Sequence, residues 1–229
     1  MPDGHSQPNA VFLDALGTLV HLDEPWPSLV RLLDERYAIH ISLEAARAAR
    51  LAEMAHYRSQ CVRACDEDSL AALRRECAEI VRRGLHPALQ EIDAEALVAL
   101  LLDSLHFRAY DDVRPALERW RAAGLARIVV SNWDISLHTV LANTGLLDLL
   151  DGVVCSAEVG ASKPDPAPFR AALELAGLPG EQVLHIGDSL DEDVAGARAA
   201  AIEPVLIHRG SGVVEPPDGV RVIASLREW

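Results

Sequence analysis

The stretch Val11-Phe12-Leu13-Asp14-Ala15-Leu16-Gly17-Thr18-Leu19-Val20 decides how the rest of the chain is interpreted. Its apolar start predicts a buried strand of a parallel sheet, and Asp14 follows at the carboxyl end of that strand. Open α/β sheets bind ligands at this edge, where a carboxylate can act as a nucleophile or a metal ligand. Gly17 permits a tight turn, and Thr18 offers a hydroxyl and an N–H to an anion. A plain core strand that ends in a capping Asp accounts for this stretch equally well.

The composition indicates a globular chain with a full hydrophobic core. It has 229 residues, of which 50% are hydrophobic, so we expect one domain with a large insertion or two small domains. No apolar run approaches the roughly 20 residues of a membrane span, and residues 1–10 do not resemble a secretory signal. We therefore expect a soluble, cytoplasmic protein without a membrane partner. The four cysteines have neither metal-site nor disulfide-framework spacing and are expected to be reduced.

The formal net charge of −14 argues against nucleic-acid binding, which needs a broad basic surface. A small phosphorylated substrate is compatible with this charge, because a local cationic site can bind it inside an acidic protein. The chain contains twenty arginines and a single lysine, Lys163. The two cations are not interchangeable in anion sites, so the one lysine is a candidate functional residue.

A long helical segment interrupts the chain after its first strand. Residues 21–27 have the composition of a linker, and from Leu29 to about Leu105 apolar residues recur at three- and four-residue spacing without a convincing strand. Helix starts are expected at Ser42 and Ser69, and a helix end at Gly84. The pattern predicts an inserted α-helical cap domain over residues 22–109.

Residues 1–21 and 110–229 are predicted to form a Rossmann-like α/β core. Apolar strands are expected at 126–130, 153–155, 183–186, 205–207 and 220–224, with helices at 116–123, 137–143, 166–176 and 191–200. This alternation is typical of a parallel sheet with right-handed crossovers. Arg209-Gly210, after one of the last strands, is expected to be a loop.

Distinctive polar residues follow several of these strands: Asp14, Ser131, Asn132, Lys163, Asp188 and Asp193. The carboxyl ends of parallel strands meet along one edge, so we expect these residues to share one pocket. Asp14 and Asp188 would repel each other without a hard cation between them, and oxygen ligands suit Mg²⁺. Asp193 could orient the waters of the metal or hold Lys163. The Ser131 hydroxyl would bind anionic oxygens, and Lys163 would neutralise charge that develops there.

These motifs resemble those of the haloacid dehalogenase-like hydrolase superfamily. Their order is right: Asp14-Ala15-Leu16-Gly17-Thr18-Leu19 is similar to the first motif, Val129-Val130-Ser131-Asn132 to the second, Ser162-Lys163-Pro164-Asp165-Pro166 to the third, and Gly187-Asp188-Ser189-Leu190-Asp191-Glu192-Asp193 to the fourth. The resemblance implies the subfamily with a helical cap between the first two motifs.

The resemblance also implies a site. Asp14 and Lys163 would be catalytic, and Thr18, Ser131, Asn132 and Lys163 would bind phosphate. Asp14, the backbone carbonyl of Leu16, Asp188 and Asp193 would hold Mg²⁺.

Leu16 departs from the phosphatases of this superfamily, which carry a second Asp at that position as general acid and base. Such proton transfer is commonly worth about 100- to 10,000-fold in rate. A substitute acid could come from His21, Glu24 or His56, although each residue is more typical of an exposed linker or helix surface.

Three functions compatible with the sequence compete. A Mg²⁺-dependent phosphatase or phosphotransferase would act on a small phosphorylated metabolite through an aspartyl-phosphate on Asp14. A 2-haloacid dehalogenase needs neither general acid nor metal, but it would have little use for the Asp188/Asp193 pair. A binding or regulatory protein with low turnover would explain the missing acid. The sequence leaves the natural substrate and the oligomeric state open.

Overall fold

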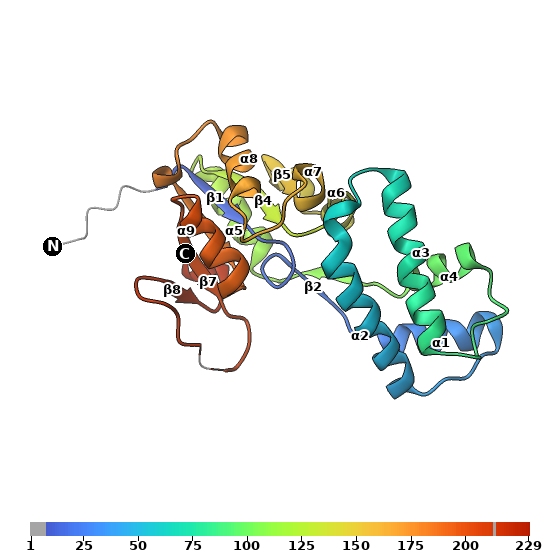
Figure 1. The fold of residues 1–229 in the computed structure, drawn as a ribbon. Helices are drawn as coiled ribbons and strands as arrows, with labels where there is room; N and C mark the ends of the chain where they lie inside the picture. The colour runs from blue at the N-terminus through green and yellow to red at the C-terminus, as the bar shows by residue number, and fades with distance from the viewer. Residues whose placement is uncertain (1–7, 213) are drawn as a thin grey trace. The chain divides into compact units, whose positions relative to one another are not determined.

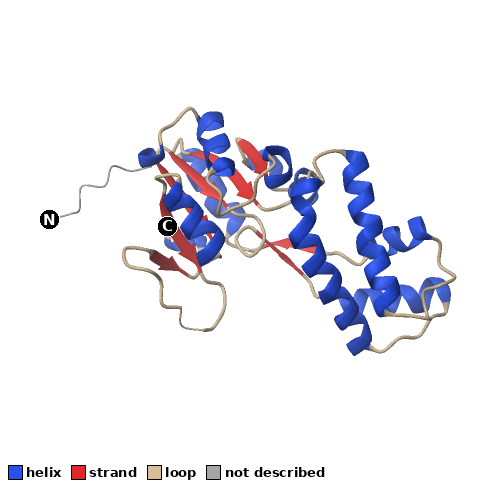
Figure 2. Ribbon diagram, viewed as in Figure 1, coloured by secondary structure: helices blue, strands red, loops and turns tan. Residues whose placement is uncertain are grey.

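The computed structural model describes residues 8–212 and 214–229. Residue contacts divide the chain into two compact units (Figures 1 and 2). One contains residues 8–21 and 109–229 and is built on a sheet, and the other, Leu22–Arg108, is built from helices. The chain therefore leaves the sheet unit after His21 and returns to it at Ala109.

The sheet unit has six parallel strands in the order β5-β4-β1-β6-β7-β8. Their bounds are β1 (Ala10–Leu13), β4 (Ala126–Ser131), β5 (Gly152–Cys155), β6 (Val183–Gly187), β7 (Glu203–Ile207) and β8 (Arg221–Ile223). β1 lies between β4 and β6, with Leu13 in register with Val129 and Ile186. This arrangement confirms the predicted α/β class.

The strand order determines on which face of the sheet the connecting helices lie. They are α5 (Val113–Ala122), α6 (Leu137–Asn143), α7 (Ser156–Val159), α8 (Ala167–Ala176) and α9 (Ala195–Ala199), with a π-helical turn at Leu190–Val194 before α9. From β1 the chain proceeds to β4 and β5, and then crosses to β6, β7 and β8 on the other side. Right-handed crossovers in the same direction place their helices on the same face of the sheet, and the crossovers through α8 and α9 both run towards β8. Phe169 of α8 and Ala197 of α9 accordingly share one hydrophobic cluster with Phe12 of β1.

The strand order reverses between β1 and β6, and this is the point at which doubly wound sheets open a crevice for ligands. Asp14 follows the last residue of β1, and Asp188 follows the last residue of β6. The topology of the sheet therefore places two of the predicted site residues on either side of the switch point.

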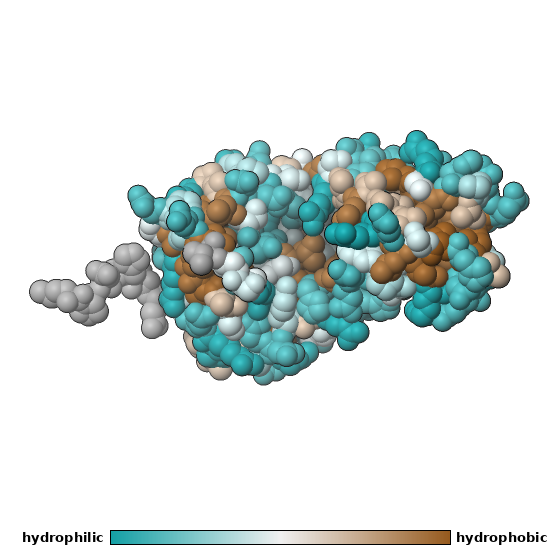
Figure 3. Space-filling model, turned by 90° about the horizontal axis from the view of Figure 1, so that it is seen from below, coloured by the Kyte–Doolittle hydropathy of each residue, from teal (hydrophilic) through white to brown (hydrophobic). Residues whose placement is uncertain are grey.

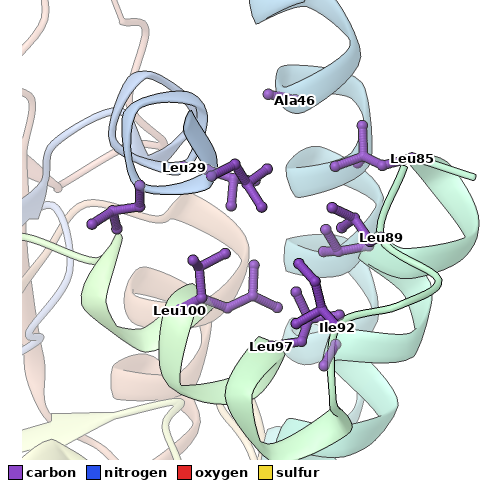
Figure 4. Packing of buried hydrophobic residues seen from close by; sticks show 13 residues of the cluster. Leu29, Ala46, Leu85, Leu89, Ile92, Leu97 and Leu100 are labelled. Atoms are coloured by element: carbon purple, nitrogen blue, oxygen red, sulfur yellow. The ribbon is translucent and has the colours of Figure 1, made fainter. Parts of the chain in front are cut away.

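The helical unit contains α1 (Pro25–Tyr37), α2 (Leu43–Gln60), α3 (Glu67–Gly84) and α4 (Ala94–Asp103). Apolar residues at three- and four-residue spacing form its core, and Figure 4 shows them converging from all four helices and the loop before α4. Leu29, Leu97 and Leu100 are fully buried in this cluster. The unit therefore has an apolar core of its own. Burial of each such leucine side chain contributes about 1.5–3 kcal/mol to its stability.

Polar caps define where the helices of this unit begin. Ser42 accepts a hydrogen bond from the Ala45 N–H at 3.1 Å, as its position predicts. The expected helix start at Ser69 is wrong: α3 begins at Glu67, because Asp66 accepts the Ser69 N–H at 2.8 Å and Ser69 Oγ lies 3.1 Å from the Asp66 N–H. Such a reciprocal capping box satisfies two backbone donors, so Ser69 belongs to the first turn.

The expectation of a linker over residues 21–27 is also wrong. β2 (Val20–Leu22) pairs with β3 (Phe107–Ala109) in a two-stranded sheet, and α1 begins at Pro25. Proline is favoured in the first turn of a helix, because the N–H that it lacks would have no helical partner there.

The surface of the helical unit is mixed. Its face seen in Figure 3 carries brown apolar side chains between teal polar ones. Tyr37, Leu43, Leu51 and Leu102 are its exposed large hydrophobic residues. None of the helices among the described residues is both long enough and apolar enough to cross a lipid bilayer.

Candidate active site

Asp14 occupies the centre of the sheet's carboxyl edge. Its backbone N–H donates to the Ile186 carbonyl at 2.9 Å, which continues the pairing of β1 with β6. The residue is only 6% exposed, and its Oδ1 accepts the Ser131 hydroxyl at 3.0 Å and the Lys163 ammonium at 2.7 Å. Both bonds go to Oδ1, so the lone pairs of Oδ2 are available to attack or to bind a cation.

Lys163 joins two carboxylates. Nζ donates to Asp14 Oδ1 at 2.7 Å, to Asp193 Oδ1 at 2.6 Å and to the Val130 carbonyl at 2.9 Å, which uses all three of its N–H groups. Burial acts to lower the pKa of Lys163, but the charges of Asp14 and Asp193 outweigh it and raise that pKa. The side chain is therefore a permanent ammonium ion.

Asp193 is held from three directions. Oδ1 accepts from Lys163 and lies 2.9 Å from His185 Nε2, while Oδ2 accepts the Ser189 N–H at 3.0 Å. Burial alone would raise the pKa of Asp193, but Lys163 and the His185 hydrogen bond lower it well below its usual range. An ionised carboxylate only accepts hydrogen bonds, so His185 carries its proton on Nε2.

Two glycines allow the acidic side chains to come close to the backbone. Gly17 has a φ of +86°, and a Cβ built on it would lie 2.1 Å from Asp188 Oδ2. A Cβ on Gly187 would lie 2.1 Å from Asp193 Cγ. Any other residue at these two positions would displace Asp188 or Asp193, so the glycines are part of the site.

The acidic residues fit a divalent cation. Asp14, Asp188 and Asp193 each offer one carboxylate oxygen, and these oxygens lie within 4.8 Å of one another. Burial, followed by the charges of Asp14 and Asp193, raises the pKa of Asp188 to about 7. Burial and the charge of Asp193 also raise the pKa of Asp14, against the opposing effect of Lys163. A hard cation would relieve this repulsion, and carboxylate oxygens are the ligands that Mg²⁺ prefers.

The predicted phosphate-binding residues differ in their placement. Asn132 Nδ2 donates to the Lys163 carbonyl at 3.0 Å and to Glu192 Oε2 at 2.9 Å, and Asn132 Oδ1 accepts the Lys163 N–H at 2.7 Å. Asn132 thus fixes the backbone of Lys163, beside the Ser131 hydroxyl. Thr18 is fully buried, and its hydroxyl has no hydrogen-bond partner among the described residues.

The structure brings Asp14, Ser131, Lys163 and Asp193 together in one hydrogen-bonded cluster, with Asp188 beside it. Two of the three residues considered as substitute acids make other contacts. The His21 ring packs on the Tyr110 ring with centroids 5.0 Å apart, and His56 Nε2 lies 3.0 Å from a Glu76 carboxylate oxygen within the helical unit. Glu24 precedes the first turn of α1.

Three residues that contact the site were not predicted from the sequence. His185 is a polar residue within a fully buried strand, which is a signal that could have singled it out. Glu192 was quoted only as part of a motif, although its carboxylate accepts from Asn132. Arg209 was assigned only to a loop, yet its Nη2 donates to the Thr18 carbonyl at 2.8 Å.

Comparison with known proteins identifies the family. A family model described as haloacid dehalogenase-like hydrolase matches residues 8–201. The glyceraldehyde 3-phosphate phosphatase of Methanopyrus kandleri is 31% identical over an alignment of 186 positions, which covers 71% of this chain and 79% of that protein. Haloacid dehalogenase-like hydrolase domain-containing protein 3 of Danio rerio is 35% identical over 130 residues, 56% of this chain, and the chain spans only 54% of that relative's length.

A solved structure of L-2-haloacid dehalogenase from Xanthobacter autotrophicus, with chloropropionic acid covalently bound, superposes with a TM-score of 0.68 at 20% identity. The alignment covers 96% of each chain, and at this identity it shows that the fold is shared. The matched family model spans all four motifs and the helical segment between the first two. This chain belongs to the haloacid dehalogenase-like hydrolases.

Proposed function

We propose that this hydrolase is a Mg²⁺-dependent phosphatase or phosphotransferase that acts on small phosphorylated metabolites through an aspartyl-phosphate on Asp14. The observation that carries this proposal is the group of carboxylate oxygens from Asp14, Asp188 and Asp193 within 4.8 Å of one another. A halide-displacing site needs no cation, whereas this cluster is electrostatically unfavourable without one. The phosphatase names of relatives such as that from Methanopyrus kandleri support the same choice.

In this mechanism Asp14 Oδ2 attacks phosphorus, and the bond to the leaving oxygen breaks with its electron pair on that oxygen. Lys163 and Ser131 hold Oδ1, so the carboxylate is oriented before the substrate arrives. Once Asp14 carries the phosphoryl group as an acyl phosphate, the carboxylate charge is lost and the Lys163 ammonium neutralises the phosphoryl oxygens instead. Attack by water or another acceptor on phosphorus then restores the carboxylate.

Asp14, Asp188, Asp193 and the backbone carbonyl of Leu16 are the residues that would hold Mg²⁺. The bound cation would neutralise negative charge on the phosphoryl group. The other residues act without it: Asn132 fixes the Lys163 backbone, and His185 and the Ser189 N–H fix Asp193.

Leu16 offers no proton to the leaving group. We therefore expect phosphate esters with acidic leaving groups to be the best substrates, because such groups depart as stable anions. The expected order of rates is 4-nitrophenyl phosphate above alkyl phosphates.

The test compares the wild type with Asp14→Asn, using 4-nitrophenyl phosphate with Mg²⁺ or with EDTA. The matched control is Asp148→Asn, since Asp148 is an exposed carboxylate on the segment that leads into β5, at the opposite edge of the sheet. We expect Mg²⁺-dependent release of nitrophenolate that disappears in Asp14→Asn and persists in the control. Metal-independent halide release from 2-chloropropionate would establish the dehalogenase instead, and inactivity in both assays would support a binding protein.

A further inference from the structure

The Arg209 side chain links distant parts of the sheet unit. It follows β7, its side chain is 14% exposed, and its Nη2 donates to the Thr18 carbonyl at 2.8 Å. Its Nη1 lies 3.1 Å from Asp112 Oδ2, and its Cζ lies 3.9 Å from the centre of the Tyr110 ring. One guanidinium thus contacts the turn after β1 and the segment that enters α5. Only arginine combines a planar stacking surface with several divergent donors.

Asp112 gives this link a fixed anchor. Its Oδ2 accepts not only from Arg209 but also from the Ser225 hydroxyl and the Leu226 N–H, each at 2.7 Å. Bonds to a charged acceptor are stronger than those between neutral groups. The guanidinium is therefore held by a carboxylate that is itself tied to the C-terminal segment, and it cannot move without breaking several bonds.

The other end of the link is the turn that follows Asp14. The Leu19 and Val20 N–H groups both donate to the Ala15 carbonyl, at 2.8 and 2.9 Å. Arg209 binds the Thr18 carbonyl, and the Tyr110 N–H donates to the next carbonyl, that of Leu19, at 3.1 Å. Two successive carbonyls of the turn are thus held from outside it.

This turn also borders the proposed metal site. Gly17, the neighbour of Thr18, packs so closely on Asp188 that a Cβ would lie 2.1 Å from its Oδ2. A displacement of the turn would therefore open or close the gap between Gly17 and Asp188, whose carboxylate lies beside that of Asp14. A shift of about 1 Å in a catalytic group can cost about 100-fold in rate.

We infer that Arg209 is a positioning residue, which holds the turn at Gly17 and Thr18 so that Asp14 and Asp188 keep the separation that catalysis and metal binding need. The inference rests on the proposed phosphatase function for its kinetic readout. The position of Arg209 also ties it to both connections to the helical unit, since Tyr110 packs on His21 at one crossing and follows Ala109 at the other.

The experiment compares Arg209→Ala with Arg127→Ala. Arg127 is a matched control because it is also buried and also pairs with a carboxylate, Asp151 at 2.6 Å, but it lies at the start of β4, away from the site. Both variants should unfold at lower temperature. Only Arg209→Ala should lose about ten- to a hundredfold in kcat toward 4-nitrophenyl phosphate at saturating Mg²⁺, with KM changed less than about twofold.

Chemical rescue separates positioning from general stability. About 20 mM guanidinium chloride should restore kcat several-fold in Arg209→Ala and in neither the wild type nor Arg127→Ala, because only the first has lost the guanidinium at this site. If Arg209→Ala does not fold, Arg209→Lys replaces it: a lysine keeps the charge but cannot stack and bind both acceptors, so kcat should still fall about three- to tenfold.

A metal-binding readout keeps this inference separate from the proposed function. The Mg²⁺ concentration that gives half of the thermal stabilisation should rise at least about threefold in Arg209→Ala or Arg209→Lys, but not in Arg127→Ala. If the wild type shows no phosphatase activity, the proposed function fails and this shift alone decides the inference. An unchanged kcat in an active protein, or the same loss in Arg127→Ala, overturns the role of Arg209.

Discussion

Replacing Asp188 by Asn should have opposite effects on the metal-free and the Mg²⁺-bound protein. Partial burial, followed by the charges of Asp14 and Asp193, raises the pKa of Asp188 to about 7 from the ordinary 3.8. Between pH 4 and 7 the folded state then binds more protons at this group than the unfolded state does. The contribution of Asp188 to the free energy of unfolding therefore falls as the pH rises through this range, and above pH 7 the ionised group destabilises the fold.

The magnitude follows from the size of the shift. Three pKa units correspond to about 4 kcal/mol, but Asp188 is only partly buried and more than about a third of its surface is open to solvent, so screening reduces the effect to about 1 kcal/mol. For a chain of this length, 1 kcal/mol corresponds to a change of about 2–4 °C in Tm. In EDTA, Asp188→Asn should raise Tm by this amount at pH 8, and the gain should disappear near pH 4.

Mg²⁺ should reverse the sign of this difference in stability, so that the wild type becomes more stable than Asp188→Asn. At a concentration 100 times its Kd, a ligand that binds only the folded state stabilises it by about 2.7 kcal/mol. At pH 8 the wild type should gain this stabilisation from Mg²⁺, whereas Asp188→Asn should gain little of it. Scanning calorimetry with EDTA or Mg²⁺ at both pH values measures the four cases.

Asp191→Asn, which removes a charge from the π-helical turn that follows Asp188, is the control for net charge in these scans. The Asp191→Asn variant should be stabilised by Mg²⁺ as much as the wild type is. Equal Tm values for wild type and Asp188→Asn at pH 8 in EDTA would refute the proposed repulsion among the carboxylates.

Three further predictions concern the lysine, the missing acid and the helical core. Lys163→Arg should reduce kcat at least about 100-fold despite its retained charge, since a planar fork cannot replace three bonds made by one Nζ; near wild-type turnover would remove Lys163 from the mechanism. Leu16→Asp should raise kcat toward alkyl phosphates by up to about 100-fold, and an unchanged rate in the folded variant would show that proton transfer occurs elsewhere. Leu100→Ala should cost about 2–5 kcal/mol in urea unfolding of the helical unit, and a loss below about 1 kcal/mol would contradict its tight packing.

Local pattern was sufficient for the fold class and for the choice of candidate residues. Apolar runs that end in a polar residue marked β1, β4 and β6, and the parallel-sheet rule then placed Asp14, Ser131 and Asp188 at one edge. Spacing of three and four residues likewise marked the helical segment. These signals lie within a few neighbouring residues, so they can be recognised without any knowledge of distant contacts. The catalytic and ligand roles of the site residues remain predictions until they are measured.

Contacts between distant segments were decided only by the tertiary structure. The strand pair β2 and β3 joins three-residue segments that are too short to show a period, and neither strand was predicted: the end of β2 falls within the predicted linker at residues 21–27. His185 and Arg209 entered the site through hydrogen bonds to Asp193 and Thr18, which depend on how neighbouring strands and their loops pack.

The physical reason is the separation along the chain of the residues that interact. Backbone periodicity and capping are set by residues three or four positions apart, and the sequence records them directly. A buried side chain finds its partner across the sheet, where Arg209 and Thr18 are separated by 191 positions in the chain. The sequence therefore determined which residues could carry the chemistry, and the packing of the sheet unit decided which other side chains hold them in place.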